Sequence, residues 1–203
     1  MILAFETSCD DTCVAIVEED GNVLSNIVSS QHDLHNEFQG IVPELASRRH
    51  CETITVVMKK ALREADLPLS GIDSVAVTYG PGLVGSLLSG IAAAKSVSAR
   101  FDLPLIPVNH IEAHVYSIEL EQSIDYPYIS LVASGGHTAL FHVQDNHNYD
   151  VLGHTRDDAA GEAYDKVAKM LDLGFPGGAE IERLAHPGPQ QCFEFPRRRL
   201  DGQ

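Results

Sequence analysis

The chain of 203 residues contains no tryptophan, and aromatic residues make up only 6% of it. Its four cysteines form no Cys-x-x-Cys pair, so nothing indicates disulfide staples and we expect reduced thiols. The first apolar run, Met1 to Phe5, is far shorter than the apolar region of a signal peptide. No run approaches the ~20 apolar residues that a membrane helix needs. These absences predict a cytoplasmic protein with no membrane partner.

Positive charge is also scarce. Lysine and arginine number 14 against 29 aspartates and glutamates, which gives a formal net charge of −15. Such a surface repels phosphate backbones, so any nucleic-acid role needs a local basic patch or a basic partner. Hydrophobic residues at 44% and charged residues at 21% are typical of a packed globular chain and exclude a disordered tail.

The first part of the chain predicts a strand meander followed by alternating helices and strands. Three runs rich in branched residues, 2–6, 13–18 and 22–28, predict the meander, with Asp20-Gly21 as a hairpin turn. The elements expected next are a helix over 43–66, a strand over 74–79, a helix from the glycine-rich stretch 80–86 to about residue 100, a strand over 103–108 and a linking helix over 109–121. This alternation predicts parallel pairing in an α/β sheet.

The opening pattern then returns about 126 residues later, comparing Ile2 with Tyr128. The expected strands are 128–133, 139–143 and 149–153, followed by a single helix over 157–173 and a turn-rich, polar end. Two facing units of this kind form the actin-like fold of actin, sugar kinases and Hsp70-type ATPases, whose first hairpins hold nucleotide phosphates. We therefore predict a duplicated, actin-like α/β fold with an incomplete second domain.

Two histidines stand out as candidate metal ligands. His110 and His114 are spaced i, i+4, which places both imidazoles on one helix face where they can share a metal ion. The alternative is a pair of surface histidines with no metal. A metalloprotease motif is disfavoured, because Glu112 lies two residues after His110 and points to the opposite side of the helix.

The first hairpin of each unit is the second candidate. In SGGHT (134–138), the glycines let backbone amides approach phosphate or carboxylate oxygens, although taken alone they are more typical of a tight hairpin with positive φ. In TSCDDT (7–12), Asp10 and Asp11 suit either a metal-bound water or a solvated turn. Cys9 and Cys13 are interpreted as packing residues, because no basic partner adjoins them.

Two further features have a structural and a ligand-binding interpretation. The stretch 80–86 lacks the lysine of a Walker sequence, so we interpret it as a helix start that packs closely on the sheet. Asp165 could accept hydrogen bonds from sugar hydroxyls, or it could be a solvated helix residue.

Six motifs occur together: ETSCDDT (6–12), QGIVPELASRRH (39–50), YGPGLVGSLLSG (79–90), HIEAH (110–114), SGGHT (134–138) and DDAAGEAYDKVAKMLDLGFPGG (157–178). In this order they resemble the bacterial TsaD family, which makes threonylcarbamoyladenosine in tRNA and was once labelled O-sialoglycoprotein endopeptidase. The resemblance implies transfer of threonylcarbamoyl from its adenylate to the exocyclic amine of the adenosine 3′ of the anticodon, in tRNAs that read codons starting with A. It also implies a divalent transition metal, iron or zinc, and as partners an actin-like paralogue and a small ATPase.

The resemblance also assigns residues. The metal ligands implied are His110 and His114, and the acids required for activity are Asp10 and Asp11. The residues implied for donor binding are Val132, Ala133, Ser134, Gly135, Gly136, Asp165, which contacts the ribose, Gly178 and Glu182. The family's third metal ligand, an Asp, and its last donor contact, an Asn, have no counterpart here.

We expect a first domain over 1–122, a partial second domain over 123–196 and a tail foreign to the family over 197–203. The implied identity is a C-terminally truncated member, inactive or only partly active by itself. Two alternatives stay open, a non-catalytic actin-like partner subunit and an actin-fold ATPase or kinase; the histidine pair favours the catalytic lineage.

Overall fold

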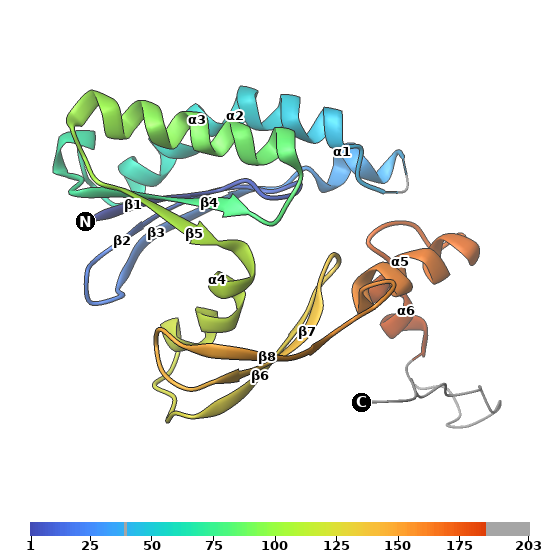
Figure 1. Ribbon diagram of the computed structural model, residues 1–203. Coiled ribbons are helices and arrows are strands. Elements are labelled where there is room, and N and C mark those ends of the chain that lie inside the picture. The colour runs from blue at the N-terminus through green and yellow to red at the C-terminus, as the bar shows by residue number, and fades with distance from the viewer. Residues whose placement is uncertain (39, 186–203) are drawn as a thin grey trace.

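The computed structural model describes residues 1–38 and 40–185, which form two β-sheets joined by a short helix (Figure 1). The first sheet has the strand order β3-β2-β1-β4-β5. Its strands are β1 (Ile2–Glu6), β2 (Thr12–Val17), β3 (Val23–Ser29), β4 (Ser74–Gly80) and β5 (Leu105–Asn109). The first three pair antiparallel, whereas β4 and β5 join parallel to β1. The predicted meander and the predicted parallel pairing are both confirmed.

Helices α2 (Pro43–Glu64) and α3 (Val84–Phe101) cover one face of this sheet (Figure 1). Proline suits the first turn of α2, because the amide that it lacks would have no partner inside the helix. The helices lie close to the ranges predicted from their apolar spacing. A short helix, α1 (His32–Asn36), and the 3-10 turn η1 (Leu69–Gly71) were not predicted, because so few residues carry no periodic signal.

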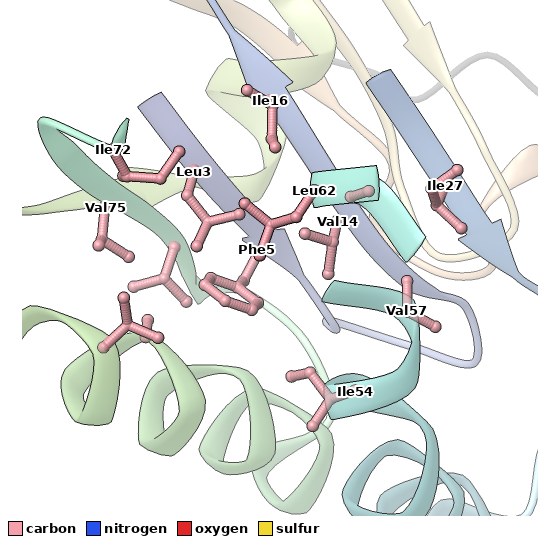
Figure 2. Packing of buried hydrophobic residues seen from close by; sticks show 14 residues of the cluster. Leu3, Phe5, Val14, Ile16, Ile27, Ile54, Val57, Leu62, Ile72 and Val75 are labelled. Carbon is pink, nitrogen blue, oxygen red and sulfur yellow. The ribbon is translucent and has the colours of Figure 1, made fainter. Parts of the chain in front are cut away.

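Alternation along the strands builds the core between the sheet and these helices. Leu3 and Phe5 of β1, together with Val14 of β2, point to the helix side and are almost completely buried. Figure 2 shows them packed against Ile54 and Val57 of α2. Burial of each side chain of this size contributes about 1.5–3 kcal/mol. The first sheet therefore has a core of its own.

The second sheet repeats the meander, as predicted. Strands β6 (Tyr128–Ala133), β7 (Thr138–Val143) and β8 (Tyr149–His154) pair antiparallel in that order. Its small core contains Val132, Phe141 and Val143 packed against Val115 of the linking helix. The opposite face is open, since Leu131 is 66% exposed.

The linking helix is shorter than predicted. Helix α4 spans His110–Tyr116 and continues only as the 3-10 turn η2 (Ser117–Leu120), whereas we predict a helix over 109–121. The helix begins at His110 because the side chain of Asn109 accepts hydrogen bonds from the amides of Ile111 and Glu112.

The prediction of a single helix after the second meander is wrong. Helix α5 (Ala160–Met170) is followed by α6 (Gly177–Ala185). The sequence Pro176-Gly177-Gly178 indicates a turn, but the carboxylate of Asp165 accepts a hydrogen bond from the Gly177 amide at 2.7 Å and satisfies the start of α6. The expected tail, 197–203, lies outside the described residues.

Within the described residues, no helix is both long enough and apolar enough to span a membrane.

Candidate functional site

The first hairpin, residues 7–11, is held by the glycine-rich stretch before α3. The amide of Leu83 donates to the Ser8 carbonyl at 2.7 Å, and the Thr7 hydroxyl donates to the Ser86 carbonyl at 2.8 Å. A Cβ on Gly82 would lie only 2.5 Å from the Ser8 carbonyl oxygen, so the close approach requires glycine. The stretch therefore begins a helix in close packing, as predicted, but these contacts are with the hairpin and not, as predicted, with the sheet.

A buried histidine fixes the hairpin from the side of α2. His50 is fully buried, and its Nε2 lies 2.9 Å from the Cys9 carbonyl while its Nδ1 lies 2.8 Å from the Thr12 hydroxyl. A carbonyl can only accept, so Nε2 carries a proton. His50 thus joins both ends of the segment that carries Asp10 and Asp11.

The chemistry of this hairpin lies in its acids and not in its thiols. Burial, with the charge of Asp10 adding to it, raises the pKa of Cys9 to about 12. Burial, with the charge of Glu6 adding to it, does the same for Cys13. The Oδ1 atom of Asp11, in contrast, is buried with no hydrogen-bond partner among the described residues. A buried carboxylate oxygen without a partner costs free energy, so a cation, a water or a ligand group is expected to bind it.

Helix α4 presents the two predicted metal ligands side by side. The Nε2 atoms of His110 and His114 lie 3.3 Å apart. Two nitrogens that bind one tetrahedral metal at about 2.0–2.1 Å are about 3.3 Å from each other, so the pair fits a shared ion. Partial burial, with His110 adding to it, lowers the pKa of His114, which keeps the ring in the neutral form that binds metals. No third His, Cys, Asp or Glu among residues 1–38 and 40–185 completes a cluster.

The other ring nitrogen of His110 faces the end of β1. Its Nδ1 lies 3.2 Å from the Ser8 hydroxyl and 3.4 Å from Oε1 of Glu6. Burial alone would raise the pKa of the Glu6 carboxyl, but hydrogen bonds with His110 and Ser8 outweigh it and hold the pKa below its usual value. Glu6 is therefore ionised at neutral pH.

The second hairpin, residues 134–137, lies on the other side of the histidine pair. The ring of His137 is 5.8 Å from the ring of His110, measured between centroids. The hairpin is closed by the Ser134 amide, which donates to the His137 carbonyl at 2.8 Å. The hairpin is tight, but neither Gly135 nor Gly136 is among the residues with positive φ, so the positive φ expected for these glycines is wrong.

The two glycines of the second hairpin lie on its open side. A Cβ on Gly135 or Gly136 would meet nothing within 4 Å, so the backbone there faces open space. Behind it, Gly161 of α5 approaches so closely that a Cβ would lie 2.7 Å from the Ser134 carbonyl oxygen. The first amides of α5 also donate to the hairpin, from Ala160 to the Thr138 hydroxyl and from Gly161 to the Ser134 carbonyl. The start of α5 therefore packs behind the hairpin, and the side at Gly135 and Gly136 stays exposed.

Asp165 and Gly178 lie together at the junction of α5 and α6. Asp165 follows Gly161 by one helical turn and so shares its face. One carboxylate oxygen of Asp165 is used by the Gly177 amide, whereas Gly178 faces open space. Glu182 is exposed further along α6.

The structure thus brings the histidine pair into contact with the first hairpin and near the second. Sequence reasoning missed Glu6, Ser8, His50 and His137, which make or approach these contacts. Ser8 and His110 are 102 residues apart, so no local spacing indicates that they meet. The binding roles assigned to the residues from 132 to 182 stay predictions.

Two meander sheets, of which the first carries parallel crossovers, define an actin-like fold. Solved structures with the same fold are similar to this chain. YeaZ from Pseudomonas aeruginosa aligns with a TM-score of 0.51 and 17% identity, covering 79% of this chain and 69% of its own. The ethanolamine utilization protein EutJ from Carboxydothermus hydrogenoformans aligns with a TM-score of 0.54 and 14% identity, covering 89% of this chain and 60% of its own.

The sequence places the chain more narrowly. The family TsaD, tRNA N6-adenosine threonylcarbamoyltransferase, matches residues 22–202, and the chain belongs to this family. The matched range continues beyond the last motif quoted above. Relatives with that name are 56% identical over 203 residues in Thermodesulfovibrio yellowstonii and 54% identical over 202 residues in Salinibacter ruber. The alignments cover 100% and 99% of this chain but 61% and 60% of those relatives, so the chain spans about three fifths of their length.

Proposed function

We propose that this chain forms part of an enzyme that transfers threonylcarbamoyl from threonylcarbamoyl-adenylate to a tRNA. The acceptor is the exocyclic amine of the adenosine 3′ of the anticodon, in tRNAs that read codons starting with A. One observation carries the proposal: two histidine nitrogens 3.3 Å apart lie between the first hairpins of the two units. The names of the relatives support it. A non-catalytic subunit would have no need of this pair.

The donor would bind against the second hairpin. Within the segment from Val132 to Gly136, the backbone at Gly135 and Gly136 faces open space, which suits amides that bind the oxygens of a phosphate. Asp165 has one carboxylate oxygen that is not bound to Gly177 and that can accept from ribose hydroxyls. Gly178 and Glu182 extend this surface along α6. The adenylate would therefore lie along the start of α5.

His110 and His114 would hold a divalent transition metal, iron or zinc. Such an ion supplies positive charge that stabilises the negative charge on the departing phosphate. The chain's own residues do the positioning. The second hairpin would hold the phosphate, while Asp10 and Asp11 would act from the first hairpin, where the buried Oδ1 atom of Asp11 has no hydrogen-bond partner among the described residues.

Further partners follow from charge and from the family. With a net charge of −15, the chain offers little for a tRNA backbone, so basic surface would come from elsewhere. We propose the actin-like paralogue and the small ATPase implied by the resemblance, acting in the cytoplasm.

Isothermal titration calorimetry with AMP tests the donor site. The variant Gly135→Val places a side chain where a phosphate would sit, and should weaken AMP binding strongly. Its matched control is Gly153→Val in β8, where a Cβ also meets nothing within 4 Å, and this variant should bind like the wild type. Equal binding by both variants would place the donor elsewhere.

The ribose contact is tested separately. Asp165→Ala should weaken AMP binding by about 1–3 kcal/mol, the usual loss for hydrogen bonds to an ionised group. Asp165→Asn keeps an oxygen for the Gly177 amide and therefore controls for the cap of α6. Unchanged AMP affinity in Asp165→Ala would remove Asp165 from the site.

A further inference from the structure

Glu6 and Ser8 meet the imidazole nitrogen of His110 that faces away from His114. The Nδ1 atom lies 3.4 Å from the Glu6 carboxylate and 3.2 Å from the Ser8 hydroxyl, whereas Nε2 faces His114. The His110 side chain is 18% exposed and that of Glu6 34%, so water only partly screens the contact. The two faces of one imidazole ring thus have different partners.

The chemistry of these partners decides where the proton of His110 lies. A carboxylate accepts hydrogen bonds and donates none, and the Glu6 oxygen lies 3.4 Å from Nδ1. A proton shared with it must therefore sit on Nδ1 of His110, and the Ser8 oxygen can accept from the same proton. Nε2 is then left with a free lone pair directed at His114. This tautomer is the one that a metal at Nε2 requires.

The position of Glu6 is itself fixed. The Ser8 amide donates to Oε1 of Glu6 at 2.9 Å, and the Ser8 carbonyl is held by the Leu83 amide against Gly82. If the carboxylate turned away, it would lose the hydrogen bond from the Ser8 amide, which the packing of the first hairpin holds in place. A fixed acceptor of this kind sets both the tautomer and the direction of the ring that it contacts.

We propose that Glu6 is a positioning residue that orients His110 for metal binding, with Ser8 as the second acceptor. The inference rests on the proposed metal site at the histidine pair and names the residue that prepares it. It also links the first hairpin to α4, so that a displaced hairpin would weaken metal binding. Glu112, on the same helix as the pair, makes no hydrogen bond or ion pair with either histidine in the described part of the chain.

Zinc affinity of the purified 203-residue chain tests the inference, measured by competition with a chromophoric chelator. Loss of a carboxylate that orients a ligating histidine typically weakens metal binding about 10–100-fold, and we expect this for Glu6→Ala. Glu6→Gln should lose less, because its amide oxygen can still accept from Nδ1. The control Glu112→Ala also removes one negative charge, in this case from α4, and should change the affinity by less than about twofold. His114→Ala should abolish specific binding.

A second readout needs no metal and no activity. Long-range ¹⁵N–¹H NMR spectra of the zinc-free chain should show His110 protonated at Nδ1, with a shift towards Nε2 protonation in Glu6→Ala but not in Glu112→Ala. This readout applies to Glu6→Gln as well, should the alanine variant fail to fold.

The outcomes separate the two proposals. Wild-type affinity in Glu6→Ala, combined with loss of binding in His114→Ala, would overturn the role of Glu6 and leave the metal site standing. Wild-type affinity in His114→Ala would overturn both. A His110 ring protonated at Nε2 in the wild type would also overturn the role of Glu6.

Discussion

The two first hairpins differ in how much of the chain holds them. The first is bound on one side by the glycine-rich stretch and on the other by His50, above a core of its own. Among residues 1–38 and 40–185, the second is held by the start of α5 and lies near the histidine pair, and its sheet exposes one apolar face that includes Leu131. The same meander is thus packed against helices in the first unit, whereas in the second unit one face of its sheet is exposed among the described residues.

This difference shows that the meander alone positions a hairpin, whereas packed helices are needed to bury the strands and fix the hairpin residues. In the first unit, α2 and α3 bury the strands and fix the acids of the hairpin. In the second, the strands and the hairpin are in place, but an apolar sheet face this exposed normally packs against something else. Within the described residues, the second unit offers nothing to cover it.

The largest expected effect concerns transfer itself. We expect no modified nucleoside from this chain, whereas the longer Thermodesulfovibrio relative should form it under the same conditions, because two histidines alone leave a metal with too few protein ligands. The assay incubates each protein with ATP, threonine, bicarbonate, unmodified tRNA and the family's partner proteins, followed by digestion and mass spectrometry. Robust product from the short chain would contradict this prediction, because the second unit would then support transfer without further ligands or covering elements.

The next effect concerns the closed first hairpin. With a pKa of about 12, Cys9 and Cys13 carry about a thousandfold less thiolate at pH 8 than an ordinary thiol. Iodoacetamide should therefore label exposed Cys51 long before either of them, and their labelling should accelerate as the pH rises towards 12. Peptide mass spectrometry locates the label. Rapid labelling of Cys9 at pH 8 would mean that the hairpin opens readily.

Matched leucines compare the two cores. Leu3→Ala should lower the free energy of unfolding by about 2–5 kcal/mol, because Leu3 is fully buried in the first sheet. Leu131→Ala should change it by less than about 0.5 kcal/mol, because the side chain lies on the open face. Urea denaturation followed by circular dichroism measures both. A large loss from Leu131→Ala would show that this face is covered in solution.

Matched glycines compare the two hairpins with the smallest expected effect. Gly82→Ala forces a Cβ against the Ser8 carbonyl and should cost about 1–3 kcal/mol of stability. Gly136→Ala meets nothing and should stay within about 0.5 kcal/mol. The same denaturation experiment applies, and equal costs would mean that the first hairpin is no more tightly held than the second.

Local patterns predicted the parts of this molecule that depend on neighbours in sequence. The meanders follow from alternation and turns, and the histidine pair follows from a spacing of four on a helix. Features that depend on distant partners were not predictable. Helix α6 starts where it does because of Asp165, twelve residues earlier. The need for glycine at position 82 comes from Ser8, and the partner of His110 comes from β1.

The proposed function depends above all on a metal ion held by the histidine pair between the hairpins. Crystals of the chain grown with zinc, with diffraction data collected on both sides of the zinc absorption edge, test it most directly. We expect one anomalous peak at about 2.0–2.1 Å from Nε2 of both His110 and His114. Zinc peaks at other sites, with none between these two nitrogens, would contradict it.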